Sequence, residues 1–280
     1  MIIDTHLHVW SDDAERYPFA EGRTQVGGGS VELLNQTMDE VGVDKAVIVQ
    51  PIYYLFDNRY VAACLRRFPG RFAAIGLVDP KAPDAPDRLE KLVREDGFGG
   101  LRIHSSRLDH PSEWAAPDQD LLWRRSEELG TCFIVHGPAA NLPHLEPIIG
   151  RFPEVPVVLD HIGGAPTDEG PPFPLLSHVL DLARFPKVYV KLTPQAHKSE
   201  LPFPHADTFP TFRRIYDAFG PQRLMWGTNF PGVMQGVGYG SALEMFRDHV
   251  DFLTDDDKAW LFHRTALQVW SFTGVAKGAE

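Results

Sequence analysis

Short apolar runs alternate with amphipathic stretches along nearly the whole chain. The runs are rich in β-branched residues and lack a regular polar alternation, which is typical of parallel strands buried on both faces. They cover residues 2–7, 46–50, 73–78, 100–104, 131–136, 155–160, 188–192 and 223–226. The spacing between successive runs leaves room for one helix and its two loops.

The stretches between the runs have the apolar periodicity and the end signals of helices. These predicted helices cover residues 30–40, 59–68, 87–95, 119–129, 142–151, 175–184, 208–219 and 241–253. A ninth, over residues 255–272, would pack Leu261, Leu267 and Trp270 on the exterior of the strands. Eight strand–helix units predict an α/β fold, a single (β/α)8 TIM barrel with an extra C-terminal helix. One domain over residues 1–280 accommodates this pattern.

Composition and charge narrow the function. The formal net charge of −11 excludes a basic surface for nucleic acid, and no apolar run reaches the length of about 18 residues that crosses a membrane. The first strand begins at residue 2, which leaves no room for a presequence. Cys64 and Cys132 fit a helix and a buried strand and form no metal-binding spacing. We therefore expect a cytoplasmic protein without nucleic-acid or membrane partners.

The first strand ends in His6-Leu7-His8. Side chains alternate along a strand, so two histidines two residues apart point to the same side. Such a pair can hold one divalent metal ion or donate to one substrate. A pair of surface histidines near the N-terminus is the alternative.

Polar side chains also end most of the other predicted strands. They are Gln50, Arg102, His104, His136, Asp160, His161, Lys191 and Asn229. The carboxyl ends of the strands of a barrel border one pocket, where barrel enzymes perform their chemistry. We therefore expect these side chains to converge.

Five segments resemble motifs of the amidohydrolase superfamily, in its amidohydrolase-related branch (amidohydrolase 2). They are IDTHLH at residues 3–8, VHG at 135–137, LDHIGG at 159–164, VYVKL at 188–192 and LMWGTNFP at 224–231. The branch contains sugar-acid lactonases, dicarboxylate-lactone hydrolases and non-oxidative decarboxylases. The resemblance implies that His6, His8 and His136 bind a divalent metal, zinc or manganese, and that His161 binds a metal-bound water or the substrate carbonyl.

Asn229 departs from that pattern, because the family has an aspartate at this point of the eighth strand, as metal ligand and general base. A neutral amide coordinates weakly and accepts no proton at physiological pH. A weakly bound or absent metal is therefore an open alternative, and His136 or His161 becomes the candidate base. Asp160 directly precedes His161, so strand alternation is expected to point it to the opposite side.

Two cations on predicted strands, Arg102 and Lys191, are candidate contacts for a small acidic substrate. A structural ion pair with Asp4, Asp79 or Asp160 is the alternative for each. Gln50 and His104 are further candidate substrate contacts.

Together with the residues, this resemblance implies a hydrolase that opens a lactone or similar activated ester of a small carboxylate-bearing metabolite. Two alternatives stay open. One is a decarboxylase or hydratase of a small aromatic or unsaturated acid. The other is a catalytically impaired homologue that binds a small acid, because Asn229 replaces the aspartate. A homodimer is common for such barrels, and the sequence leaves the oligomeric state open.

Overall fold

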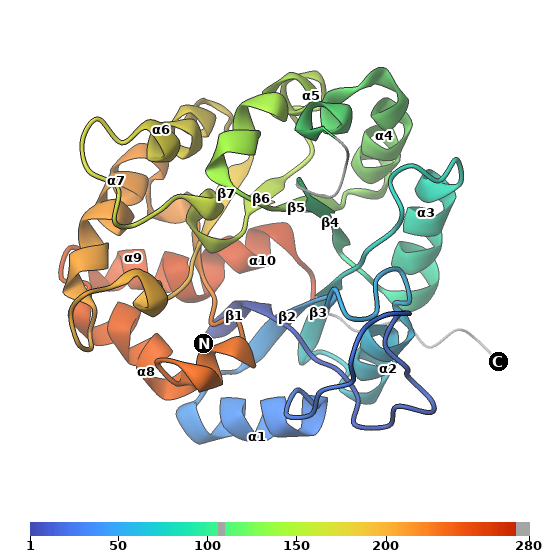
Figure 1. Cartoon of the computed structure of the whole chain (residues 1–280), viewed down its shortest axis with the longest axis horizontal. Helices are drawn as coiled ribbons and strands as arrows, with labels where there is room; N and C mark the ends of the chain where they lie inside the picture. The colour runs from blue at the N-terminus through green and yellow to red at the C-terminus, as the bar shows by residue number, and fades with distance from the viewer. Residues whose placement is uncertain (106–109, 273–280) are drawn as a thin grey trace.

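The computed structural model of the chain describes residues 1–105 and 110–272. Its centre is a ring of parallel strands surrounded by helices (Figure 1). The strands are β1 (Ile3–Leu7), β2 (Lys45–Val49), β3 (Phe72–Ile75), β4 (Gly100–His104), β5 (Cys132–His136), β6 (Val157–Leu159), β7 (Val188–Leu192) and β8 (Leu224–Trp226). Strands β1–β3 form one sheet and β4–β8 another. Two parallel bridges, Gly76 with Leu101 and Leu7 with Phe230, join these sheets into the predicted (β/α)8 barrel.

The outer layer consists of helices that follow the strands. They are α1 (Val31–Val41), α2 (Arg59–Arg67), α3 (Ala85–Asp96), α4 (Asp120–Leu129), α5 (Glu146–Arg151), α6 (Pro174–Asp181), α7 (Phe209–Phe219), α8 (Tyr239–Glu244), α9 (Asp255–Ala259) and α10 (Thr265–Val269). Helix α1 shows the expected end signals. The Ser30 side chain accepts from the Leu33 backbone N–H, and Gly42 ends the helix in the left-handed conformation. The predicted helices are confirmed with shifted ends.

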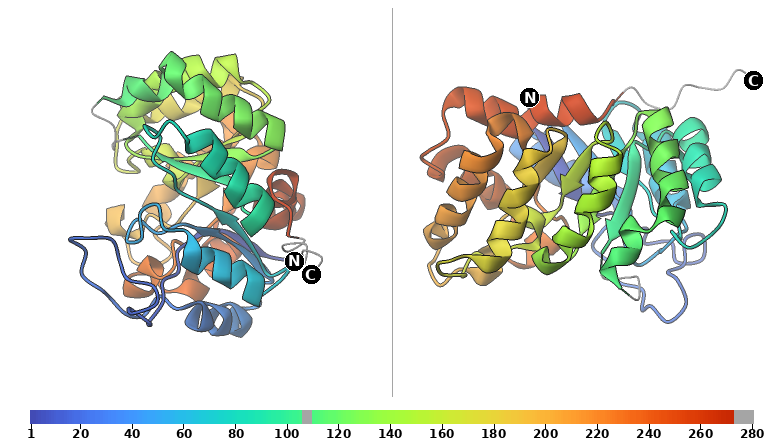
Figure 2. Two further views of the ribbon diagram at one scale, coloured as in Figure 1. Left: turned by 90° about the vertical axis from the view of Figure 1, so that its right-hand side faces the viewer. Right: turned by 90° about the horizontal axis from the view of Figure 1, so that it is seen from above.

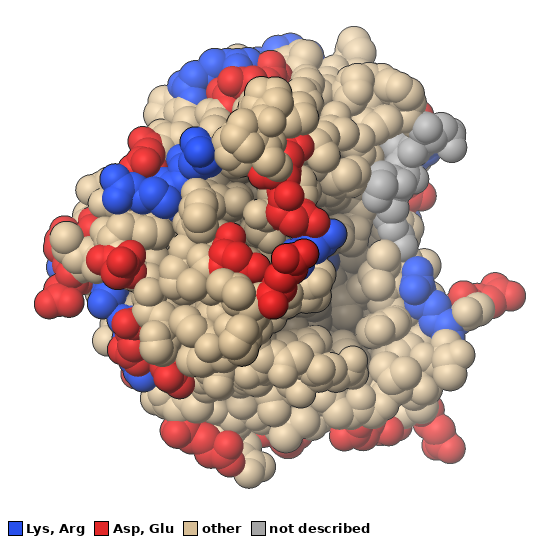
Figure 3. Space-filling view, turned by 60° about the vertical axis from the view of Figure 1, so that its left-hand side comes forward, with Lys and Arg blue, Asp and Glu red and all other residues tan. Residues whose placement is uncertain are grey.

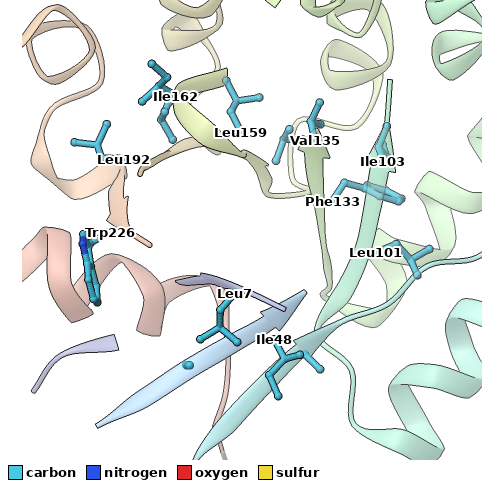
Figure 4. Close-up of a cluster of buried hydrophobic side chains, with 14 of the residues drawn as sticks. Leu7, Ile48, Leu101, Ile103, Phe133, Val135, Leu159, Ile162, Leu192 and Trp226 are labelled. Atoms are coloured by element: carbon cyan, nitrogen blue, oxygen red, sulfur yellow. The ribbon is translucent and has the colours of Figure 1, made fainter. Parts of the chain in front are cut away.

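The barrel has two hydrophobic layers, one between the strands and the surrounding helices and one in the interior of the barrel. Leu7, Ile48, Phe133, Leu159 and Trp226 belong to the large layer between strands and helices (Figure 4). A smaller layer includes Val47, Ile134, Val158 and Met225, the neighbours in sequence that alternation turns to the other face. Each strand is therefore apolar on both sides, which explains the unbroken apolar runs of the sequence.

The C-terminal helix packs differently from our expectation. Trp270, just after α10, belongs to the smaller layer with Val47 and Met225, and its Nε1 donates to the Cys132 sulfur at 3.2 Å. The red α10 segment thus covers the end of the barrel opposite the blue loop of residues 11–29 (Figure 2). Leu267, expected in this contact, is 46% exposed, so that part of the prediction was wrong. Sealing one end leaves the carboxyl ends of the strands as the open face.

Among the residues that the structure describes, the helices are too short or too polar to cross a bilayer.

Candidate active site

Five imidazoles follow one another across the open face of the barrel. Ring centroids of His6 lie 5.0 Å from His8 and 4.3 Å from His161. His136 lies 5.5 Å from His161 and 5.3 Å from His104. The rings of each pair meet edge to face. The predicted convergence of histidines from four different strand ends is therefore present in the fold.

A register irregularity in β1 places the first two histidines. Ile3 faces the barrel interior, and simple alternation would turn His6 outward. The pairing of β1 with β2 shifts between Asp4 and Leu7, and after this bulge Leu7 faces the helices. His6 therefore points inward, as bulges beside functional sites often arrange. Gly227 on the neighbouring β8 end makes room, because a Cβ atom there would lie 2.7 Å from the His6 Cβ.

Asp160 is the centre of a buried charge cluster beneath the histidines. Its Oδ1 lies 2.9 Å from His6 Nδ1 and 3.0 Å from Lys191 Nζ. Its Oδ2 accepts from Arg102 Nε at 3.0 Å and lies 2.9 Å from Arg102 Nη2. Burial would raise the pKa of Asp160, but His6, Lys191 and Arg102 outweigh burial and hold that pKa well below its usual 3.8. With Asp160 ionised and His6 neutral, two cations face one anion, and the cluster keeps one surplus positive charge.

The expected outward orientation of Asp160 was wrong. Val158 faces the interior, so alternation along β6 brings Asp160 inward as well. Strand β6 ends at Leu159, and His161 has a left-handed φ of 49°. Regular alternation therefore stops between Asp160 and His161, and both side chains reach the centre of the barrel.

Hydrogen bonds determine which ring nitrogen of His8 and of His161 carries the proton. His8 Nδ1 lies 2.8 Å from the Val49 carbonyl oxygen, which can only accept, so Nδ1 holds the proton and Nε2 is left as an acceptor. His161 Nδ1 lies 3.2 Å from Thr193 Oγ1, which accepts from Gln195 Nε2 at 3.0 Å. The Thr193 hydroxyl is thus free to donate to His161, which would leave the His161 proton on Nε2.

Burial keeps these imidazoles neutral. It lowers the pKa of His8 and of His161 to about 3, and the pKa of His136 to about 4. The positive charge of Arg102 acts in the same direction on all three. At neutral pH each ring therefore has one donor and one acceptor nitrogen.

Asn229 is held in a left-handed conformation with φ of 67°. Its backbone N–H donates to the His6 carbonyl at 2.7 Å. The preceding Thr228 donates to Asp4 from its backbone N–H at 3.0 Å and from its hydroxyl at 2.6 Å, and Tyr239 donates to the same carboxylate at 2.9 Å. Asp4 therefore fixes the β8 loop to β1, and this contact positions Asn229 at the cavity.

The cavity on this face has two connected lobes. The loop lobe, about 560 Å³, is bounded by Pro166, Leu175, Gln195, His197, Lys198 and Val237. The aromatic lobe, about 460 Å³, is bounded by His8, Trp10, Tyr53, Arg102 and His104. His136, His161, Asn229 and Gly232 line both lobes. The space-filling view shows the hollow on this face, with acidic and basic side chains around it (Figure 3).

The predicted catalytic residues His136, His161 and Asn229 therefore lie where the lobes meet, and Arg102 and His104 line one lobe. Gln50 and Lys191 do not face the lobes, and neither has exposed surface. Gln50 donates to the Leu55 and Asp57 carbonyls at 3.2 and 2.8 Å, because it shares the outward face of β2 with Ile48. The expected direct substrate contact of these two residues is thus not what the structure shows.

The predicted metal ligands fit a metal ion incompletely. His6 and His8 resemble metal-binding histidines, because each Nδ1 meets an oxygen acceptor and His6 Nε2 is buried without a partner. Over residues 1–105 and 110–272, however, no three His, Cys, Asp or Glu side chains come together as a metal site. The Arg102 and Lys191 charges below would also oppose a cation. The predicted ligands therefore do not form a complete metal site.

Comparison of the chain with known proteins shows the family to which it belongs. Residues 3–272 match the family model described as amidohydrolase. The chain belongs to this amidohydrolase family. It is 30% identical over 235 residues to the 4-sulfomuconolactone hydrolase of Rhizobium radiobacter, covering 81% of this chain and 75% of that protein. The L-fucono-1,5-lactonase of Burkholderia ambifaria is 28% identical over 96% of this chain and 94% of its own.

Another relative is the D-galactarolactone isomerase of Agrobacterium fabrum, 25% identical over 82% of this chain and 76% of that protein. Among solved structures, a Pseudomonas putida protein assigned as 2-pyrone-4,6-dicarboxylic acid hydrolase has a TM-score of 0.82 at 23% identity, covering 97% of both chains. A Burkholderia multivorans amidohydrolase with bound zinc has a TM-score of 0.78 at 21% identity, covering 96% of this chain and 98% of that one. These likenesses confirm the TIM-barrel fold.

Proposed function

We propose that this amidohydrolase opens a lactone of a small compound that bears an acidic group. The observation that carries the proposal is the junction of the two lobes. There, neutral imidazoles surround a cavity that no described Asp or Glu lines, above a cluster with surplus positive charge. Such a site attracts an anion and stabilises negative charge on a carbonyl oxygen. The lactone hydrolases among the relatives support the same reaction.

In the proposed reaction one residue accepts a proton from water, and two others donate hydrogen bonds to the substrate. His8 Nε2 accepts a proton from water as the water oxygen bonds to the lactone carbonyl carbon. His161 Nε2–H donates to the carbonyl oxygen, and Arg102 binds the acidic group of the substrate. The bond from that carbon to the ring oxygen then breaks, and the ring oxygen takes the proton back from His8. The products are a carboxylate and a free hydroxyl, with one proton released to solvent.

Asn229 has a different chemical role from the aspartate that the family has at the end of the eighth strand. Its amide nitrogen can donate to the substrate, but its oxygen accepts no proton at neutral pH. An imidazole with a pKa of about 3, such as His8, is a weak base. We therefore propose an activated ester as substrate, because its carbonyl needs less help from the base than an amide does.

Asn229 also favours a second candidate, lactone isomerisation. There the acyl group moves from one hydroxyl of the substrate to another, and activation of water would destroy the product. A site without a carboxylate at the eighth strand suits such a reaction, and the isomerase among the relatives supports it. The oligomeric state stays open, and a cytoplasmic location stays a prediction.

A lactone panel with a pH indicator, combined with proton NMR of the products, tests the proposal. Hydrolysis releases acid and forms the open hydroxy acid, isomerisation changes the spectrum at constant pH, and decarboxylation consumes a proton. We expect acid release that falls about 100-fold or more in His8→Asn and His161→Asn. His178→Gln on α6, outside both lobes, is the control. Ligand-induced thermal stabilisation without turnover of any lactone would instead identify a binding protein.

A further inference from the structure

The proposed reaction leaves one buried cation unused. Lys191 on β7 has no exposed surface, and its Nζ lies 3.0 Å from Asp160 Oδ1. His6 Nδ1 lies 3.4 Å from the same Nζ, but its proton points to Asp160, which leaves no lone pair for the lysine. Asp160 also pairs with Arg102, so this one carboxylate is shared between two buried cations. Lys191 therefore needs a second favourable contact for its charge.

The face of the Trp270 indole ring supplies this contact. Lys191 Nζ lies over the ring, 5.6 Å from its centroid, and Trp270 is buried. The electrons of an aromatic face attract a cation, and the attraction is strongest where water is excluded. Among residues 1–105 and 110–272, no carboxylate besides Asp160 pairs with Lys191. The ring thus stabilises the ammonium charge that Asp160 leaves uncompensated.

The ring is held at the end of the barrel that α10 covers (Figure 2). The chain leaves α10 at Trp270 with an extended backbone, and the Trp270 Nε1–H donates to Cys132, the first residue of β5. Gly99, just before β4, leaves room for the ring edge, because a Cβ atom there would lie 2.9 Å from Trp270 Cδ1. Asp160 instead follows the last residue of β6. Lys191 therefore connects the closed end of the parallel strands to the charge cluster beneath the open face.

We propose that Trp270 is a positioning residue of the active site, whose ring face holds the Lys191 ammonium against Asp160 and so keeps surplus positive charge beneath the imidazoles. The inference rests on the proposed function, because that charge attracts the acidic group of the substrate. Trp270 lines neither lobe of the cavity and acts through Lys191 alone. Without the ring, the ammonium loses one of its two contacts, Arg102 pairs with Asp160 by itself, and the site binds an anion less tightly.

A role in packing alone makes a different prediction. Trp270 belongs to the interior hydrophobic layer, where another large apolar side chain could fill much of its volume. The proposed role requires in addition an aromatic face at the ammonium of Lys191. Variants that retain or remove this face therefore separate the two roles.

Calorimetry with benzoate, a monocarboxylate without an ester to open, tests the ring. We expect Trp270→Leu to weaken benzoate binding about 5- to 10-fold, because leucine has no aromatic face. Trp270→Phe keeps such a face and should stay within about 2-fold of the wild-type affinity. Cys132→Ala is the matched control, because it removes the sulfur that accepts from Trp270 Nε1 and leaves the indole in place. Equal losses in Trp270→Leu and Trp270→Phe, or no loss in either, overturn the proposal.

A double-mutant cycle tests whether Trp270 acts through Lys191. Lys191→Met removes the ammonium and leaves Arg102 paired with Asp160, so no buried charge remains alone. In this background we expect Trp270→Leu to weaken benzoate binding no further, because the ring has no cation to hold. Additive losses would show that the two residues act independently and would contradict the proposal.

A substitution that preserves the shape of the ring covers the case in which Trp270→Leu does not fold. Tryptophans with increasing numbers of fluorine atoms, introduced at position 270 alone, withdraw electrons from the ring face at nearly constant size. We expect benzoate affinity to fall with each added fluorine in the wild-type background and to stay constant in Lys191→Met. A constant affinity in the wild-type background, or undetectable benzoate binding, sinks the proposal.

These measurements need no turnover, so the two proposals can fail separately. If benzoate affinity depends on the Trp270 ring through Lys191 and no lactone is opened, the proposed reaction fails and the role of Trp270 stands. If lactones are opened and the cycle is additive, the reaction stands and the role of Trp270 fails.

Discussion

The Nδ1 atom of His6 lies 2.9 Å from Oδ1 of Asp160, with both side chains buried in the barrel. This contact joins β1 to the end of β6 and directs the His6 Nδ1 proton to the carboxylate. Lys191 and Arg102 contact the same carboxylate, so a single buried anion at the end of β6 joins three other strands, β1, β4 and β7.

We expect Asp160→Asn to lower the free energy of unfolding by about 3 to 5 kcal/mol, because Arg102 and Lys191 would remain buried without an anion. Chemical denaturation monitored by tryptophan fluorescence measures the change. The double variant Asp160→Asn with Lys191→Met removes one of the two cations and should regain part of the loss. A single variant as stable as the wild-type protein would contradict the buried cluster.

The free energy of unfolding should decrease as the pH is lowered below about 6.5. Burial holds the pKa of His8, His136 and His161 in the folded protein at about 3, 4 and 3, below the usual 6.5 of histidine. The unfolded chain therefore binds more protons between these values and pH 6.5, so the stabilisation is complete above pH 6.5 and is lost as the pH falls. Burial raises the pKa of Asp4 to about 6, which opposes this trend by one proton.

Burial also lowers the pKa of His6 well below its usual value, so four histidines oppose one aspartate. The net difference of about three protons predicts a slope on the order of 4 kcal/mol per pH unit near pH 5.5. Denaturant unfolding at a series of pH values measures it. His161→Asn removes one titrating group and should reduce the slope by about one proton. A flat profile between pH 7 and pH 5 would show that these histidines are not neutral in the folded protein.

Asn229→Asp should increase lactone hydrolysis about 10-fold or more, because a carboxylate at the junction of the lobes can accept a proton from water. Steady-state kinetics with pH-indicator detection measures this, and Asn229→Ala is the control that removes the amide alone. If both substitutions abolish activity, the amide itself has a chemical role. Gain of a bound metal together with activity would identify a site that the amide has weakened.

Protein purified without a histidine tag should hold substoichiometric zinc or manganese after dialysis. The described residues do not gather three ligands of the usual types, and Arg102 and Lys191 place positive charge below His6. Elemental analysis of the dialysed protein measures the metal content. One equivalent of tightly held zinc or manganese would contradict this expectation and return His6, His8 and His136 to the role of ligands.

Much of this site could be predicted from the sequence, because strand ends of a barrel converge and the histidine motifs mark those ends. The face that each side chain occupies was harder to predict. His6 faces inward because of a bulge. Asp160 and His161 both face inward because β6 has ended at Leu159 and the left-handed φ of His161 interrupts the alternation. Gln50 illustrates a signal that was available: it shares the phase of Ile48, which faces the helices.

The order of apolar runs and helices along the chain determined the barrel, since burial on both faces and strand–helix alternation are local patterns. The pairing of His6 with Asp160, the neutral state of the histidines and the two lobes of the cavity were decided by the tertiary structure. These features depend on distances between strands far apart in sequence and on exclusion of water, and the spacing of residues along the chain predicts neither.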